Sequence, residues 1–337
     1  MSASDAAAPP PRSNSHARFA RRTAAALGYA FRSLDGADAY LFEVHDGARS
    51  AVFACGAATP YALNPAHAYG LARDKAFAAQ VLAQAGLPTI PSRLFFATTR
   101  HAAFRTPGRE PADARAFAQS APYPVFCKPN AGSRGELAEI IGDAAQFEDY
   151  LMRVAWAHDA FLVQPYLRGR EHRVFVLHDR ALFSYEKSKP FLIGDGRSSL
   201  AHLLAAQQQR ATGAAPSPPE SLRYFDPEGR ALAPSDRPAA GMRILVEGPA
   251  NRAAGGDAVR VIDGARPALA QLALTAARAL DLRLCALDVF DLSAEGDLSA
   301  LCVIEANASP AIETLEAHDR FDLIETIWAA NFAAALR

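Results

Sequence analysis

The chain has 337 residues, half of them hydrophobic, and its 35 basic and 36 acidic residues leave a formal net charge of −1. That length suits about two domains, and near-neutrality excludes the basic surface that binds nucleic acid or anionic membranes. No apolar run approaches the roughly 18 residues that span a bilayer, and the first residues lack the apolar core of a secretory signal. We therefore expect a soluble protein with neither nucleic-acid nor membrane partners.

The cysteines are widely scattered and form no C-x-x-C pair; they are Cys55, Cys127, Cys285 and Cys302. This spacing gives no support to a zinc site or a redox pair. A reducing cytoplasm is the expected location.

The amino-terminal part divides at about residue 16. Residues 1–16 are rich in Ala, Ser and Pro and predict a disordered tail. Residues 17–74 predict a short α/β region, with one helix followed by a hairpin-like pair of strands before residue 62.

The next section, residues 75–168, begins with a predicted helix. Phe77, Val81 and Leu82 recur at helical spacing, and Gly86 and Pro88 then end the helix. A strand over 123–130 runs into a glycine-bearing turn, a helix is predicted over 145–157, and a strand over 161–167.

The section from residue 169 to 337 alternates strands and helices. Strands are predicted over 172–178 and 181–187, and Ser199 is placed to cap a following helix. Residues 211–241 are rich in Pro, Ala and Gly and predict a long connection. A strand over 242–248 and a helix beginning at Pro267 follow.

The chain ends with two predicted strands, 282–290 and 301–307, and an amphipathic helix. The apolar stripe of that helix predicts core packing; its members are Phe321, Ile324, Trp328 and Phe332.

The two last strands carry a cluster of oxygen-bearing side chains. Alternate strand residues share a face, so Glu305 and Asn307 lie side by side with Val303, and hairpin pairing would bring Asp288 to them. Taken alone, residues 303–310 are better explained by a strand end that reaches solvent. Yet two carboxylates held close need a cation between them, and such oxygens suit Mg²⁺ bound to phosphates.

A second feature is suited to phosphate. Lys128 ends a predicted strand, and Gly132, Ser133 and Gly135 follow it in a turn whose small residues would let backbone N–H groups approach phosphate oxygens. The G-x-x-x-x-G-K-[ST] pattern is absent, which excludes that nucleotide-binding fold. Taken alone, Lys75 on its predicted helix is better explained as a solvated surface lysine.

In their order along residues 70–316, six segments resemble the ATP-grasp superfamily of carboxylate–amine ligases, above all the ATP-grasp module of cyanophycin synthetase and bifunctional glutathione synthetases. The segments are RDKAFAAQVLAQAGLPT, VFCKPNAGSRG, FLVQPYLRGREHRVFVL, IGDGRSSLAHLL, PANRAAGGD and LDVF with VIEANASP. The resemblance implies an α+β ATP-grasp fold in which two α+β lobes clasp ATP after a short α/β amino-terminal region. The small lobe would span 75–168 and the large lobe 169–337, with the metal site.

The resemblance also implies roles on the nucleotide side. Lys75 and Lys128 would hold the α- and β-phosphates, and Ser133 and Gly135 would cover them. Arg173 would steady the phosphate or acyl phosphate, which makes Arg173 and Lys128 the candidate catalytic residues.

The base and ribose would be bound by the segment between two strands. Gln164 and Leu167 would line the adenine pocket, and Glu171 would accept hydrogen bonds from the ribose. Gln164 departs from the glutamate frequent in the family, and Pro165 beside it cannot donate a backbone hydrogen bond.

The resemblance further implies a metal site and a substrate loop. The cofactors would be ATP and two Mg²⁺ ions, with Mn²⁺ as an alternative metal. Asp288, Glu305 and Asn307 would bind the metal, and the substrate side would be a loop that contains Asn251, Gly255 and Gly256.

The implied activity is ADP-forming amide or peptide bond formation. A carboxylate, from an amino acid or small peptide, would be phosphorylated by ATP, and an amine would displace phosphate from the acyl phosphate. A phosphotransferase and a non-catalytic nucleotide-binding protein are the alternatives. The expected partners are a small-molecule carboxylate and amine, with a homodimer as one oligomeric state.

Overall fold

The computed structural model describes residues 14–56, 58–132, 135–187, 191–212, 223–228, 230–247 and 260–337. Contacts divide the chain into a unit of residues 1–65 with 309–337 and a unit of residues 66–308. From sequence, residues 309–337 are predicted to belong to the large lobe, because boundaries read from a sequence follow chain continuity and not contacts across the fold. Among the described residues, no helix has the length and apolarity that crossing a membrane requires.

The first unit contains an antiparallel sheet in the order β1 (Ala30–Ser33), β2 (Leu41–His45) and β3 (Ser50–Ala54). Its helices are α1 (Ser15–Leu27), α8 (Glu313–Ala317) and α9 (Phe321–Ala335). The sequence predicts only a pair of strands in this region and a tail that extends to residue 16. The Asn14 side chain accepts a hydrogen bond from the His16 N–H at 3.1 Å, so the helix begins at Ser15 and the prediction of a tail is wrong for Ser15 and His16. Residues 1–13 of the predicted tail lie outside the described residues.

The core of the first unit is aromatic. Ile324, Trp328 and Phe332 on α9 are fully buried, which confirms core packing for these three, whereas Phe321 is only half-buried. The Trp328 ring contacts Phe42 and Phe53 on the neighbouring strands β2 and β3, with centroids 6.2 Å away in both cases.

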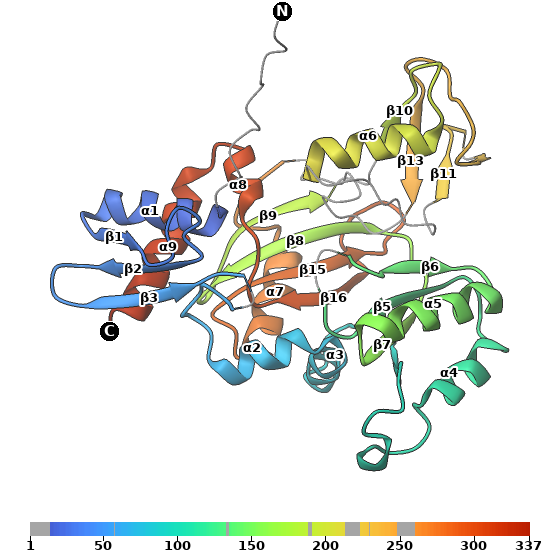
Figure 1. Ribbon diagram of the computed structural model, residues 1–337, viewed down its shortest axis with the longest axis horizontal. Helices are drawn as coiled ribbons and strands as arrows, with labels where there is room; N and C mark the ends of the chain where they lie inside the picture. Colours follow the sequence, from blue (N-terminus) through green and yellow to red (C-terminus); the bar gives the residue numbers. More distant parts are fainter. Residues whose placement is uncertain are drawn as a thin grey trace, which may run out of the picture. The chain divides into compact units, whose positions relative to one another are not determined.

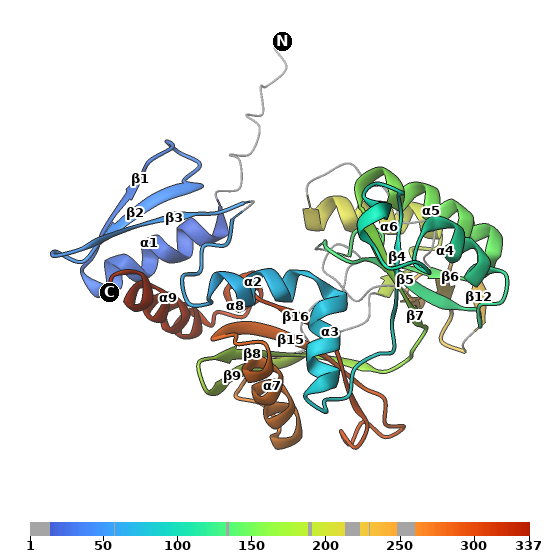
Figure 2. The ribbon, with the colours of Figure 1, turned by 90° about the horizontal axis from the view of Figure 1, so that it is seen from below.

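The central sheet of the second unit is antiparallel, with its strands in the order β14 (Ile262–Asp263), β9 (Arg180–Lys187), β8 (Arg170–Leu177), β15 (Leu284–Asp291) and β16 (Leu301–Asn307). Helix α7 (Pro267–Ala279) packs on β8, β9 and β15, as Figures 1 and 2 show. Pro267 occupies its first turn, as predicted. Helices α2 (Ala66–Arg73) and α3 (Lys75–Gln84) pack against the edge strand β16.

A second sheet is formed by β4 (Arg93–Phe96), β7 (Ala160–Pro165), β5 (Val125–Pro129) and β6 (Glu139–Ile141), in that order. Helices α4 (Pro111–Ala118) and α5 (Ala144–Ala157) pack on it, and a 3₁₀ turn, η1 (Ala102–Phe104), precedes them. Figure 2 shows both helices beside this sheet. Phe147 and Phe161 meet in its core.

A smaller sheet has the order β10 (Phe191–Ile193), β13 (Arg243–Glu247), β11 (Arg223–Phe225) and β12 (Ala231–Leu232), with α6 (Leu200–Thr212) beside it. The Ser199 hydroxyl accepts a hydrogen bond from the His202 N–H at 3.3 Å, which confirms the predicted cap. The predicted long connection is wrong where β11 and β12 pair. Strands this short show no alternation within a segment rich in Pro and Gly.

Candidate functional site

Strands β15 and β16 bring the expected oxygen-bearing side chains together. Asp288 pairs directly with Glu305, and Ala286 pairs with Asn307, so all three polar side chains emerge on one face. The Asn307 Nδ2 lies 3.4 Å from Asp288 Oδ2 and 3.5 Å from Glu305 Oε1. The two carboxylates and the carboxamide therefore converge, as strand alternation predicts.

A bulge in β16 changes the position of Val303. Asp288 pairs with Glu305 but Val289 pairs with Val303, which leaves Ile304 unpaired. The extra residue turns Val303 toward the apolar core that contains Val289. The expectation that Val303 shares the face of Glu305 is therefore wrong, because a bulge breaks the period of two.

Asp288, on β15, contacts two cationic side chains, Arg173 on β8 and Lys187 on β9. Arg173 lies opposite it on β8, with Nε–Oδ1 and Nη2–Oδ2 distances of 2.7 Å, and Lys187 Nζ lies 3.0 Å from Oδ2. Asp288 is only 2% exposed. Burial alone would raise the pKa of its carboxyl, but Arg173 and Lys187 hold that pKa well below its usual range. The carboxylate therefore stays ionised.

Lys187 is a member of the site that sequence reasoning missed. It pairs with Glu171 across β8 and β9, and its ammonium contacts the Glu171 carboxylate as well as Asp288. Burial lowers the pKa of Lys187, but the two carboxylates outweigh burial and raise it. The sequence could have indicated Lys187 through strand register. If the two strands after Gly169 pair as a hairpin, the end of β9, which contains Lys187, lies opposite the start of β8.

Two further lysines come from the other elements. Lys128, at the end of β5, is 6% exposed, and its Nζ lies 3.9 Å from Glu305 Oε2. Lys75 is the first residue of α3, and its Nζ donates a hydrogen bond to the Gly132 carbonyl at 2.9 Å. Burial lowers the pKa of Lys75, and the charge of Glu305 opposes this effect. The ammonium groups of Lys128 on β5 and Lys75 on α3 thus lie near the Glu305 carboxylate on β16.

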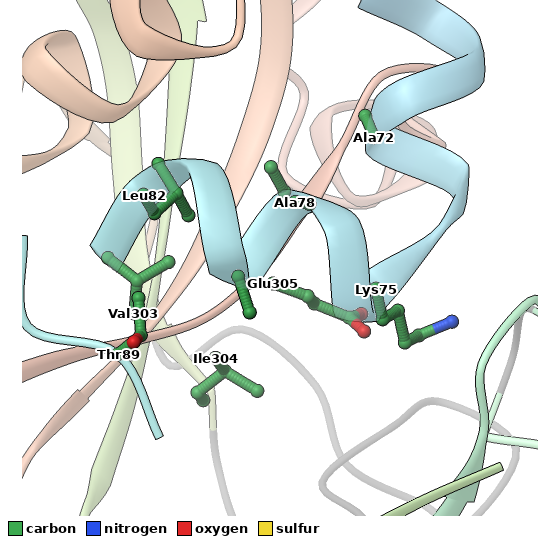
Figure 3. Close-up of a pocket in the computed structure, with 10 residues that line it drawn as sticks. Ala72, Lys75, Ala78, Leu82, Thr89, Val303, Ile304 and Glu305 are labelled. Carbon is green, nitrogen blue, oxygen red and sulfur yellow. The ribbon is translucent and has the colours of Figure 1, made fainter. Parts of the chain in front are cut away.

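A small pocket between α3 and β16 adjoins these groups. Figure 3 shows Lys75 at one end, beside Glu305, and Leu82 and Val303 at the other. Its volume of about 10 Å³ is enough for about one water molecule and far too small for a nucleotide.

The residues expected to bind the base lie at the end of β7 and just after it. Gln164 is buried, and its Nε2 donates a hydrogen bond to Ser92 Oγ at 2.7 Å. Leu167 lies in the segment that joins β7 to β8, three residues before Arg170. Pro165 ends β7 opposite Val125.

The remaining expected residues fall on loops. Gly135 has a φ of +72°, a conformation that suits glycine. Four others lie outside the described residues, namely Ser133, Asn251, Gly255 and Gly256.

The donor chemistry of the cluster fits Mg²⁺. Hard cations prefer carboxylate and carbonyl oxygens, and half a turn of the Asn307 carboxamide would direct its oxygen toward both carboxylates. Within the described residues, His, Cys, Asp and Glu alone form no metal-holding group of three, so the candidate set depends on this carboxamide. Lys128 and Lys75 would supply positive charge for a bound polyphosphate.

Antiparallel sheets with helices packed on them confirm the predicted α+β class, and in this arrangement the chain resembles the ATP-grasp fold. The crystal structure of a bifunctional glutathione synthetase from Pasteurella multocida matches 95% of this chain and 44% of that chain, with a TM-score of 0.51 and 20% sequence identity.

Sequence comparison points to the same proteins. The chain is 25% identical over 252 residues to a glutathione biosynthesis bifunctional protein of Desulfotalea psychrophila, over 71% of this chain and 31% of that protein. The corresponding protein of Mannheimia succiniciproducens is 27% identical over 260 residues, which are 70% of this chain and 32% of that protein. The chain thus spans about a third of the length of these relatives. No protein-family model matches the sequence. The relatives confirm the resemblance to ATP-grasp ligases.

Proposed function

We propose that the chain is an ATP-dependent carboxylate–amine ligase that forms an amide or peptide bond through an acyl phosphate. The observation that carries the proposal is the convergence of Asp288, Glu305 and Asn307 on one sheet face, with Lys128 beside Glu305 and Arg173 on Asp288. The sequence relatives support the same chemistry.

The proposed reaction has two steps. A carboxylate oxygen of the acid forms a bond to the γ-phosphorus of ATP, and the bond from that phosphorus to the β–γ bridging oxygen breaks, which releases ADP. The amine nitrogen then bonds to the acyl carbon, the carbon–oxygen bond to phosphate breaks, and the nitrogen loses a proton. Neither step requires a side-chain nucleophile.

The basic residues would bind and orient the nucleotide. Lys75 and Lys128 would hold the α- and β-phosphates, which carry the charge that their ammonium groups neutralise. Arg173 would steady the transferring phosphoryl group, and its bidentate contact with Asp288 keeps the guanidinium in one orientation. Lys187 lies on the same face and is a further cation for this charge.

Asp288, Glu305 and Asn307 would hold two Mg²⁺ ions, or Mn²⁺ in their place. Such ions neutralise the charge between phosphate oxygens and the incoming carboxylate. Gln164 and Leu167 would line the adenine pocket and Glu171 would bind the ribose. Ser133 and Gly135 would cover the phosphates, and a substrate loop would contain Asn251, Gly255 and Gly256.

The substrates are proposed to be small molecules, an amino acid or short peptide as the acid and an amino acid as the amine. Nucleic acids are not proposed as partners. A cytoplasmic location and a homodimeric state are parts of the same proposal.

The test is a screen of acid and amine pairs with Mg-ATP. We expect ADP and phosphate in equal amounts and, by mass spectrometry, a product equal in mass to acid plus amine minus water. A phosphorylated acid or alcohol without amide would identify a phosphotransferase instead. Absence of both ADP formation and ATP binding by calorimetry would overturn the proposal.

A variant pair sharpens this test. Lys128→Met keeps the length of the side chain and removes its charge, so it should weaken Mg-ATP binding by roughly tenfold or more. Arg180→Ala, on an exposed residue at the start of β9, is the control and should bind Mg-ATP as the wild type does.

A further inference from the structure

Asn130 joins two elements that carry candidate phosphate ligands. It follows Lys128 by two residues, just beyond the end of β5, and is 8% exposed. Its backbone N–H donates to the Ala160 carbonyl at 2.9 Å, which holds it to the start of β7. Its carbonyl accepts from the Lys75 N–H at 3.1 Å, and its Oδ1 accepts from the Ala76 N–H at 2.9 Å.

These contacts satisfy the start of α3 from outside that helix. The first N–H groups of a helix have no partner within it. In α3, Asp74 Oδ1 accepts from the Phe77 N–H at 2.9 Å, which leaves the N–H groups of Lys75 and Ala76 to Asn130. The local cap at Asp74 therefore supplies only one of the acceptors that the start of α3 needs, and Asn130, just beyond β5, supplies two more.

The contacts also determine where Lys75 lies. Its backbone is bound to Asn130, and its Nζ is bound to the Gly132 carbonyl at 2.9 Å. Lys128 is fixed by the pairing of β5 with β7. Asn130 is thus the residue through which the position of Lys75 is tied to that of Lys128.

We propose that Asn130 is a positioning residue that sets the spacing of Lys75 and Lys128 for a polyphosphate. The proposal rests on the proposed function and deepens it, because a nucleotide held at two phosphates by two elements needs a fixed distance between the two ammonium groups. A shift of α3 of about 1 Å would weaken the contact with Lys75 and leave the contact with Lys128 in place.

A double-mutant cycle with Asn130→Ala and Lys75→Met tests the proposal, read as the dissociation constant for Mg-ATP by calorimetry. Removal of Asn130 Oδ1 should raise the constant about tenfold when Lys75 is present. In the Lys75→Met background the same change should raise it less than about twofold, because Asn130 acts through Lys75. A generally structural role would give equal effects in both backgrounds, which would overturn the proposal.

Asp143→Ala is the matched control. Asp143 caps α5 through the Gln146 N–H at 2.8 Å, so its loss also removes a side-chain acceptor from a first-turn N–H, in a helix with no candidate phosphate ligand. Both single variants should lower the melting temperature, but only Asn130→Ala should weaken nucleotide binding. Hydrogen exchange should quicken at the Ala76 amide in Asn130→Ala alone.

The outcomes separate the two proposals. A wild-type chain that binds no Mg-ATP would overturn the proposed function together with this inference. Tight binding that Asn130→Ala leaves unchanged, with Lys128→Met still impaired, would overturn the role of Asn130 alone.

Discussion

Arg173 and Asp288 lie directly opposite each other on β8 and β15, joined by two hydrogen bonds of 2.7 Å. A carboxylate this deeply buried stays charged only when cations lie close to it, because the free energy lost on desolvation of an isolated ion is larger than the free energy gained from other contacts. Lys187 at 3.0 Å is its other cation. The pair therefore joins Asp288, the candidate metal ligand, to Arg173, the candidate ligand of the transferring phosphoryl group. Its loss should also lower the stability of the fold.

Arg173→Met should destabilise the fold strongly. The change leaves Asp288 buried with Lys187 as its remaining cation, and loss of one partner from a buried pair costs about 3 kcal/mol or more. Urea unfolding monitored by circular dichroism would measure the loss. Arg115→Met is the matched control, since the Arg115–Glu148 pair has the same donor geometry but is solvent-exposed, and should cost no more than about 1 kcal/mol. Equal losses in the two variants would contradict the role of burial.

Glu305→Gln should abolish most ATP turnover without unfolding the chain. The change conserves volume and removes the charge that would face a metal and Lys128, so ADP formation should fall by roughly 100-fold or more. The melting temperature should stay close to that of the wild type, because Glu305 is only partly buried. Glu43→Gln, on a strand of the first unit and paired with Arg32, is the control. Full activity in Glu305→Gln would contradict the assignment of Glu305 as a metal ligand.

Part of this arrangement could be predicted because it depends on local periodicity. The helix that begins at Lys75 follows from the helical spacing of Phe77, Val81 and Leu82. The convergence of Asp288 and Glu305 needs only alternation and a hairpin. Such features are set by residues within a few positions of one another, so a single sequence contains them.

Other features could not be predicted, because they depend on contacts between distant segments. The bulge at Ile304 leaves no mark in the hydrophobic pattern, and Lys187 joins the site only through register with Glu171. Likewise α9 packs with β2 and β3, although the whole second unit separates them in sequence. Asn130 looks like an ordinary turn residue until its bonds to α3 are seen.

With adenine placed beside Gln164 as proposed, Ser92 should control the preference for ATP over GTP. The Ser92 hydroxyl donates to the Ile90 carbonyl at 2.9 Å, so it must accept from the Gln164 Nε2 at 2.7 Å. The Gln164 oxygen is then directed elsewhere and can accept from an exocyclic amine. In Ser92→Ala the carboxamide can turn, and the ratio of kcat/KM for ATP over GTP should fall by about tenfold.

Ser92→Thr keeps the hydroxyl and should retain most of the preference for ATP. Gln164→Glu supplies only acceptors and should retain the preference for an amino group on the base. An unchanged ratio of kcat/KM for ATP over GTP in Ser92→Ala would show that the base does not bind at Gln164.

Mg-ATP binding should weaken at alkaline pH because of Lys75. Burial lowers the pKa of this lysine, so its ammonium loses a proton at a lower pH than the roughly 10.4 of a solvated lysine. Only the protonated form attracts phosphate, and the affinity should therefore fall as pH rises through the lowered pKa. Lys75→Arg keeps its charge throughout and should bind Mg-ATP without this fall. Calorimetric titrations from pH 6 to about 10 would measure both curves, and coincident curves would contradict the assignment.

The lowered pKa of Lys75 also determines how the free energy of unfolding changes with pH. Between the lowered pKa of the folded chain and the ordinary pKa of the unfolded chain, the unfolded state binds more protons, so the free energy of unfolding should rise with pH. Below that window the charged, buried lysine destabilises the fold by a constant amount. Lys75→Met has no proton to lose, and its unfolding free energy should lack this rise. Urea unfolding of both chains across the window measures the difference, and parallel curves would show that Lys75 is as well solvated in the folded chain as in the unfolded one.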